Sequence, residues 1–276
     1  MLTEEQKKRR LSGLGASDSP IVMGFSSFKT PYELYLEKTG LVSIEDKEES
    51  EQQYWGNKLE ATIREHFAEF NGVTVETPDT IYHKEHDFIF ANLDGFIPEL
   101  NAVLEIKCAN SFMRAQWDAA LDDGIPMQYL VQIAKQVALA NAGCGYCAVL
   151  IGGSEYRQYK YERDLDLERM IIDSDRRFWD CVTNKVEPDP ICISDLALMY
   201  PKSTMTSLPV TESIYMDIEF IKMERETIRI HEDKMEKLKM NVMSYMKEAE
   251  CIVEADNRPL ATWKQNKRGT RAFLIK

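Results

Sequence analysis

The chain has 276 residues, of which 44% are hydrophobic and 29% are charged. This composition supplies enough apolar material for a buried core and excludes disordered, collagen-like and disulfide-rich small proteins. Its apolar runs are too short to cross a bilayer and its first residues lack a signal-peptide core, so we expect a soluble, cytoplasmic protein with no membrane partner. The formal net charge is −12, yet residues 258–276 hold six basic and no acidic side chains. That basic tail fits a polyanionic partner and a solvated terminus equally well.

Helix signals are strong near the N-terminus. The segment from Thr30 to Glu33 combines a capping box with proline at the first helical position, which predicts a helix closing at Gly40. A longer helix is expected from Tyr54 to Asn71, with Gly72 as its end. Its apolar stripe consists of Leu59, Ile63, Phe67 and Phe70.

Strand-type and helix-type segments alternate through the middle of the chain. The expected strands are 73–76, 81–84, 88–97, 102–108, 146–151 and 156–161, and the expected helices are 111–122, 126–143 and 165–183. This order predicts a mixed α/β unit in which helices flank a mixed sheet, and we assign it to residues 1–187.

The last third of the chain has a different pattern. Pro188, Pro190, Pro201 and Pro209 indicate an irregular linker over 188–212. Apolar residues then recur at every seventh position from Ile214 to Ala249, which predicts one long helix. A short basic β-hairpin is expected after Pro259, so that 213–276 forms a C-terminal region. The long helix fits packing against a partner or over the α/β unit, and the sequence leaves both open.

Six cysteines are scattered along the chain, and only Cys144 and Cys147 have the spacing of a metal or redox pair. Without a second such pair or neighbouring histidines, burial as small hydrophobic side chains is favoured over zinc binding or redox chemistry. The same scatter argues against an iron–sulfur cluster, which needs several thiolates together.

The chemically informative residues are Asp94, Glu105 and Lys107. Side chains alternate faces along a strand, so Glu105 and Lys107 share one face of theirs. If that strand forms a hairpin with the preceding one, centred on residues 99–100, Asp94 falls directly opposite Glu105, with Cβ atoms about 5 Å apart. Directly opposed carboxylates repel each other, which favours a hard cation such as Mg²⁺ between them. Lys107 would then lie beside the cation and orient or deprotonate an attacking water.

Two interpretations of this pattern stay open from spacing alone. The functional one needs a third carboxylate, and Glu60 is the best-placed candidate because it flanks an apolar helical stripe just before the sheet. The other is a solvent-facing ladder of ion pairs that has no catalytic role.

Five ordered segments carry a resemblance to a known family. They are Gly15-Ala16-Ser17-Asp18 continuing through Gly24 to Leu34, Gly56-Asn57-Lys58-Leu59-Glu60, Leu93-Asp94-Gly95, Glu105-Ile106-Lys107 and Tyr129-Leu130-Val131-Gln132. In this order they resemble the YqaJ family of phage recombination exonucleases, which is related to lambda exonuclease within the PD-(D/E)XK nuclease class. The chain departs from many relatives at Phe96-Ile97-Pro98, where a shorter turn leaves the strand register open.

The resemblance implies a PD-(D/E)XK nuclease core and a specific set of site residues. The implied magnesium ligands are Glu60, Asp94, Glu105 and the carbonyl of Ile106. Lys107 is implied as the catalytic lysine, acting with Asp94 and Glu105, and Gln132 is implied to position substrate or water. Ser17, Ser27 and Lys29 are implied to lie near the 5′-phosphate end of the substrate.

By the same resemblance, we expect a Mg²⁺-dependent 5′-to-3′ exonuclease on linear double-stranded DNA, with Mn²⁺ able to substitute. Its 3′ overhangs would feed phage-type recombination by single-strand annealing in a bacterial host. The implied partners are double-stranded DNA ends, a single-strand annealing protein and further copies of the chain in a trimer. Two other functions stay open: a repair or CRISPR-type nuclease of the same superfamily, and a non-catalytic DNA-end-binding adaptor.

Overall fold

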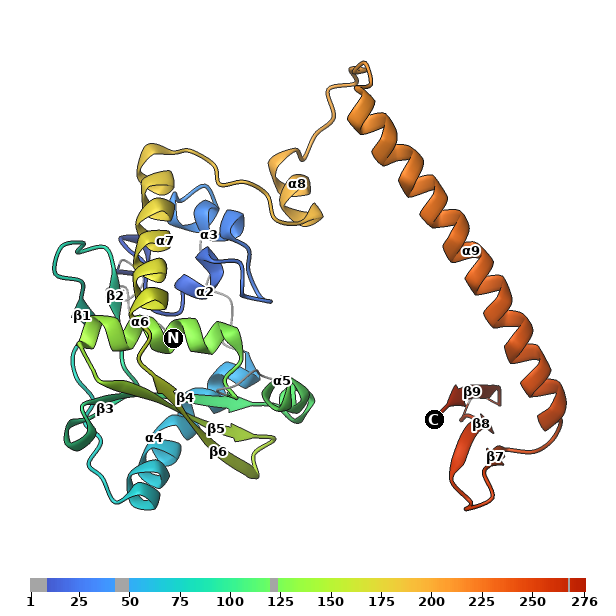
Figure 1. Ribbon diagram of the computed structural model, residues 1–276, viewed down its shortest axis with the longest axis horizontal. Coiled ribbons are helices and arrows are strands. Elements are labelled where there is room, and N and C mark those ends of the chain that lie inside the picture. The colour runs from blue at the N-terminus through green and yellow to red at the C-terminus, as the bar shows by residue number, and fades with distance from the viewer. Residues whose placement is uncertain (1–8, 43–49, 120–123, 268) are drawn as a thin grey trace. The chain divides into compact units, whose positions relative to one another are not determined.

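The computed structural model describes residues 9–42, 50–119, 124–267 and 269–276. The chain divides into two compact units, one up to Lys202 and one from Ser203 (Figure 1). Within the described ranges, no helix is both long and apolar enough to cross a membrane.

The first unit is built on a four-stranded mixed sheet. Its strands lie in the order β3 (Gly95–Ile97), β4 (Ala102–Ala109), β5 (Cys144–Ile151) and β6 (Glu155–Glu162). The pairs β3/β4 and β5/β6 are antiparallel, whereas β4 and β5 are parallel. A parallel pair needs a crossover connection, and helix α6 (Met127–Ala140) lies within it. The predicted fold class, a mixed sheet flanked by helices, is confirmed.

Helices cover both faces of this sheet (Figure 1). On one face, α4 (Glu51–Asn71) buries Ile63 and Phe67 in a cluster with Leu104 and Ile106 of β4. On the other face, α6 packs against the sheet through its apolar side. That side consists of Val131, Ile133, Ala134 and Val137. Alternate residues of one strand therefore belong to different cores, as the two-residue period of a strand requires.

Helix α4 ends at Asn71 before Gly72, as predicted, but its start differs from the prediction. It begins at Glu51, three residues early, because Ser50 and Gln53 form a capping box. Phe70 lies in the last turn beside the rings of His66 and Tyr156, and 67% of it is exposed. Phe70 is therefore an exposed member of the predicted apolar stripe, in which Ile63 and Phe67 are buried. An apolar stripe is buried only where another element covers it, which the helical period does not report.

A second core joins the N-terminal segment to α7 (Leu165–Asn184). Helices α2 (Ser19–Val22) and α3 (Pro31–Lys38) contact α7. The buried side chains of this core are Leu14, Tyr32, Leu34, Tyr35, Phe178 and Val182. The predicted capping box of α3 is confirmed, because the Thr30 hydroxyl accepts from the Glu33 N–H and the Glu33 carboxylate accepts from the Thr30 N–H.

Short elements complete the first unit. β1 (Ile81–Tyr82) pairs with β2 (Phe90–Ala91), and a 3₁₀ turn (Pro98–Leu100) joins β3 to β4. A second 3₁₀ turn (Ser111–Met113) precedes α5 (Arg114–Asp118), where we had expected one helix over 111–122. Residues 120–123 of that prediction lie outside the described residues. The expected strand 73–76 contributes a single bridge, between Glu76 and Phe96, and the predicted linker 188–212 contains helix α8 (Ile193–Met199).

The two closely spaced cysteines belong to different cores. Both lie on β5, but Cys144 packs in the cluster on the α4 side and Cys147 in the cluster on the α6 side. Their odd spacing along a strand points the side chains to opposite faces, so the two sulfurs cannot share a ligand. The predicted packing role of both thiols is confirmed by their burial.

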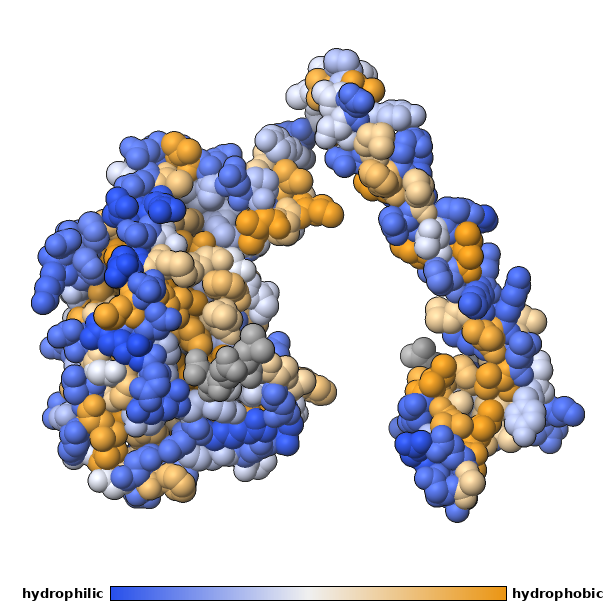
Figure 2. Space-filling model, in the orientation of Figure 1, coloured by the Kyte–Doolittle hydropathy of each residue, from blue (hydrophilic) through white to orange (hydrophobic). Residues whose placement is uncertain are grey.

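The second unit contains the predicted long helix and a small sheet. α9 (Glu212–Met246) is followed by β7 (Cys251–Val253), β8 (Pro259–Gln265) and β9 (Arg271–Ile275), which form an antiparallel sheet. β8 and β9 are the expected hairpin, and Arg268 between them lies outside the described residues. Strand β7 was not predicted, because three residues directly after a helix give too short a pattern. Hydrophobic residues recur along α9 and gather around the terminal sheet (Figure 2).

Candidate active site

The pairing of β3 with β4 fixes the position of Asp94. Gly95 pairs with Leu104 and Ile97 with Ala102, which is the register of a hairpin centred on residues 99–100. Asp94 immediately precedes β3, and one further step of this register places it opposite Glu105. Its Oδ2 atom accepts a hydrogen bond from the Ile106 N–H at 2.8 Å. The predicted strand register is confirmed, despite the proline-constrained turn.

Burial separates the two interpretations of the charged pattern. Glu105 is only 1% exposed, because β4 is an inner strand with a helix over each face. Lys107 shares the α6 face with Glu105, and its side chain is 22% exposed. A solvent-facing ladder of ion pairs is therefore excluded. A buried carboxylate on an inner strand costs free energy unless donors surround it.

Donors surround both oxygens of Glu105. Lys107 Nζ lies 2.5 Å from Oε1, and Gln132 Nε2 donates to the same oxygen at 2.6 Å. Gln132 also accepts from Lys107 Nζ through its Oε1 atom at 3.2 Å, so one amide connects the acid and the amine. Gln136 Nε2 donates to the second oxygen, Oε2, at 2.6 Å. Gln136 was missed by the sequence analysis, although it lies one helical turn beyond Gln132 and so faces the same strand.

The surroundings of Asp94 and Lys107 raise the pKa of both side chains. Burial, followed by repulsion from Glu105, raises the pKa of Asp94 to about 8, against the opposing effects of Lys107 and the Ile106 N–H. Burial alone would lower the pKa of Lys107, but Glu105 and Asp94 raise it above its ordinary value. Lys107 therefore carries its charge at neutral pH. The Tyr129 ring centroid lies 5.0 Å from Nζ and adds a cation–π contact.

The donor set fits a hard divalent cation in its chemistry. Asp94 and Glu105 supply the carboxylate oxygens that Mg²⁺ prefers, and a cation would remove the repulsion that raises the Asp94 pKa. Glu60 of α4 lies near enough to contribute to that rise, but its carboxylate is paired with Arg64. Among the described residues, no three acidic, histidine or cysteine side chains are gathered around a common metal position. The structure thus brings together Asp94, Glu105, Lys107 and Gln132, and leaves Glu60 beside them.

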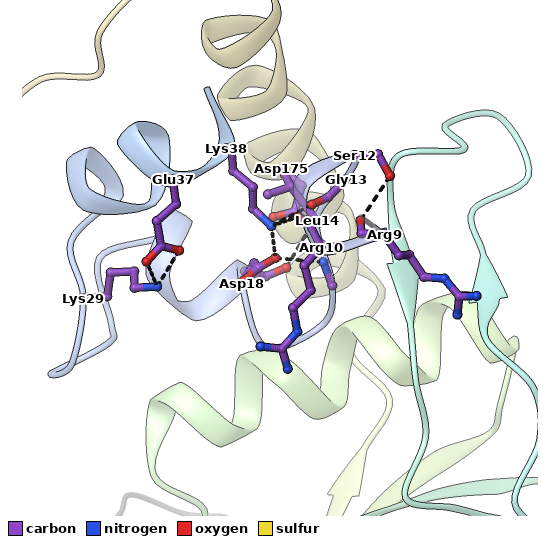
Figure 3. Close-up of polar contacts among 12 residues, drawn as sticks. Arg9, Arg10, Ser12, Gly13, Leu14, Asp18, Lys29, Glu37, Lys38 and Asp175 are labelled. Carbon is purple, nitrogen blue, oxygen red and sulfur yellow. Dashed lines mark hydrogen bonds and ion pairs between the residues drawn. The ribbon is translucent and has the colours of Figure 1, made fainter. Parts of the chain in front are cut away.

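The three residues expected near a 5′-phosphate lie on the N-terminal segment. Ser17 and Ser27 are exposed, and Lys29 Nζ lies 2.6 and 2.7 Å from the two oxygens of the Glu37 carboxylate (Figure 3). Within the described part of the chain, none of the three forms a hydrogen bond or ion pair with the Glu105 cluster. Their roles stay predictions.

Two lysines hold the backbone at the start of this N-terminal segment, Lys38 from α3 (Figure 3) and Lys135 from α6. Lys38 Nζ donates to the carbonyls of Arg10 and Gly13 and to Asp18 Oδ2, the last two at 2.8 Å. Lys135 Nζ donates to the carbonyls of Leu14 and Gly15, at 2.9 and 3.0 Å. Lys135 belongs to α6, so the helix that carries the two site glutamines also holds the N-terminal segment.

Comparison with known families and curated proteins gives two matches. Residues 5–143 match the YqaJ-like viral recombinase domain family. The uncharacterized protein YqaJ of Bacillus subtilis (strain 168) is 35% identical over 182 residues, which cover 65% of this chain and 56% of that relative. The chain therefore spans little more than half the length of the curated relative.

Solved structures with exonuclease folds match as well. An alkaline exonuclease from Laribacter hongkongensis, LHK-Exo, matches 67% of this chain and 95% of its own, with a TM-score of 0.56 and 21% identity. A putative exonuclease from Eubacterium rectale matches 79% and 98%, with a TM-score of 0.51 and 14% identity. At these identities the matches show a shared fold. The family match includes all the predicted site residues between Ser17 and Gln132, and the chain belongs to the YqaJ-like viral recombinase domain family.

Proposed function

We propose that this protein is a Mg²⁺-dependent deoxyribonuclease that digests linear double-stranded DNA from its 5′ ends. The observation that carries the proposal is the buried cluster in which Lys107 and Gln132 contact Glu105, with Asp94 directly before the neighbouring strand β3. Membership of a viral recombinase family and the exonuclease fold support the same reaction.

The chain's own residues have distinct tasks in this proposal. Asp94 and Glu105 would hold the cation. Glu60 would join them once its carboxylate leaves Arg64, and the Ile106 carbonyl is a further candidate ligand. Bound Mg²⁺ or Mn²⁺ supplies Lewis-acid activation of water and neutralises charge on the phosphate. Lys107 keeps its proton, so it orients the attacking water and offsets charge on phosphorus rather than removing a proton. Gln132 forms hydrogen bonds with both Glu105 and Lys107 and so fixes the position of one relative to the other.

The finer properties are proposed from the family resemblance. The products would carry 3′ overhangs suited to recombination by single-strand annealing, with an annealing protein as partner. Ser17, Ser27 and Lys29 would lie near the 5′-phosphate, and the Lys29 ammonium would have to leave Glu37 to reach it. A trimer around the duplex would let an acidic chain, with net charge −12, enclose a basic channel.

A linear duplex labelled separately at each 5′ and 3′ end tests the reaction. In Mg²⁺ we expect early release of the 5′ label, a retained 3′ overhang and no digestion of a closed circular duplex. EDTA should stop the reaction. Release of the 3′ label first would contradict the polarity, and DNA-end binding without digestion in Mg²⁺ or Mn²⁺ would favour the adaptor. Full activity in Lys107→Ala or Asp94→Ala would remove the assignment of the site.

A further inference from the structure

Gln136 is fully buried and holds the oxygen of Glu105 that the catalytic lysine does not reach. Its Nε2 atom donates to Glu105 Oε2 at 2.6 Å and to the backbone carbonyl of Asn92 at 3.2 Å. Asn92 lies two residues before Asp94, so this one amide joins Glu105 of β4 to the segment that carries Asp94. Gln132 and Lys107 contact the other oxygen, Oε1. Each oxygen of Glu105 therefore accepts a hydrogen bond from a different glutamine.

The contacts of Gln136 settle which way its amide points. Both neighbours of Nε2 are acceptors, and only the NH₂ end of an amide donates. The carbonyl end, Oε1, must then point elsewhere. That oxygen is buried, and within the described part of the chain it has no hydrogen-bond donor.

The two hydrogen bonds donated by Nε2 account for one end of the amide, but an acceptor buried without a donor at the other end is unfavourable. The orphaned Oε1 is explained if a donor arrives with a ligand. The ligand that fits beside Glu105 and Asp94 is a hydrated divalent cation, because Mg²⁺ sheds its waters reluctantly and keeps several when bound.

We propose that Gln136 is a positioning residue for the cation, which orients Glu105 through Nε2 and accepts a hydrogen bond through Oε1 from a water that enters with the hydrated ion. This inference rests on the proposed function, because it takes the Asp94 and Glu105 pair as the cation site. Partners of this kind set metal affinity, and their loss costs about 10–100-fold in affinity or activity.

The test is a Mn²⁺ titration of the full chain without DNA, followed by the magnetic resonance signal of free Mn²⁺. We expect Gln136→Met to raise the Kd for Mn²⁺ by about 10-fold or more. The thermal unfolding midpoint in EDTA should fall by a few degrees at most, because Glu105 Oε2 loses its donor while the unsatisfied Oε1 acceptor is removed with it. If cleavage is measured, the Mn²⁺ concentration for half-maximal rate should rise, and saturating Mn²⁺ should restore the rate.

Gln158→Met is the matched control. Gln158 of β6 exchanges two 3.0 Å hydrogen bonds with Asn71, so its loss also removes a partly buried amide, but one that contacts neither site carboxylate. Its Kd for Mn²⁺ should stay within about twofold of wild type. If Gln136→Met unfolds, Gln136→Asn, which is too short to keep both contacts, should show the same weakened binding.

The outcomes separate this inference from the proposed function. An unchanged Kd in Gln136→Met overturns the inference even if the wild type digests DNA. A wild type that binds no Mn²⁺ overturns it too. A wild type that binds Mn²⁺ through Gln136 but cleaves no DNA supports the inference and contradicts the nuclease.

Discussion

The two faces of β4 differ although both are buried. On the α4 side, Leu104 and Ile106 pack with apolar residues, and their burial stabilises the fold. On the α6 side, Glu105 is just as inaccessible but is charged, and it needs Lys107 and two glutamines to satisfy it. A buried ion pair contributes little net stability compared with apolar side chains of similar size. The comparison indicates that the α4 face maintains the fold and that the α6 face serves the chemistry.

The strongest test of this division is the loss of a carboxylate. We expect Glu105→Ala to lower the cleavage rate by at least about 10²-fold, because the group that binds the cation and anchors Lys107 is removed. Urea unfolding in EDTA should show a loss of stability of less than about 3 kcal/mol, because Lys107 is 22% exposed and keeps Asp94 as a carboxylate neighbour. Near-normal cleavage by Glu105→Ala would show that the α6 face is not catalytic.

A second buried ion pair joins α6 to α7, and we expect it to matter for stability rather than for cleavage. Lys135 Nζ lies 2.7 Å from Asp175 Oδ2, both side chains are inaccessible, and the same oxygen accepts from the Ser19 hydroxyl at 2.8 Å. Asp175→Ala would leave Lys135 charged and unpaired, at a cost of about 3–5 kcal/mol in urea unfolding.

The double substitution Lys135→Met with Asp175→Leu is the control for this pair. It should recover most of the lost stability, because apolar side chains of similar volume replace both charges. If the single and double variants unfold alike, the stability lost in Asp175→Ala does not come from the unpaired charge of Lys135.

A substitution on the apolar α4 face should lower the stability of the protein and leave its affinity for Mn²⁺ unchanged. We expect Leu104→Ala, at a position that is 0% exposed, to cost about 3 kcal/mol in urea unfolding, because it opens a cavity against α4. Its Kd for Mn²⁺ should stay within about twofold of wild type at temperatures where it is folded. A large loss of Mn²⁺ affinity would mean that the two faces are coupled.

The sequence predicts the positions of the site residues only where they depend on residues nearby in the chain. Alternation along β4 and a hairpin with a fixed centre are enough to place Asp94, Glu105 and Lys107, because both depend on neighbouring residues. The contact of Gln136 with Glu105 depends on how α6 docks on the sheet, and the only local signal for it is its spacing of four residues from Gln132. Glu60 shows the same limit: its helix was predicted, but the pairing of its carboxylate with Arg64 was not.

The smallest expected effect is the pH dependence of stability that Asp94 causes on the charged face. In metal-free protein the raised pKa of Asp94, about 8 against 3.8 for the ordinary side chain, means that the folded state binds a proton that the unfolded state has released. The free energy of unfolding should therefore fall as pH rises between about 4 and 8, and level off above that. Asp94→Asn imitates the protonated side chain and removes this dependence. We expect the variant to gain about 1–2 kcal/mol over wild type between pH 6 and pH 8 in EDTA, measured by urea unfolding. Parallel pH profiles for the two proteins would show that Asp94 is ionised without a cation, and that the carboxylate pair is already balanced by Lys107 alone.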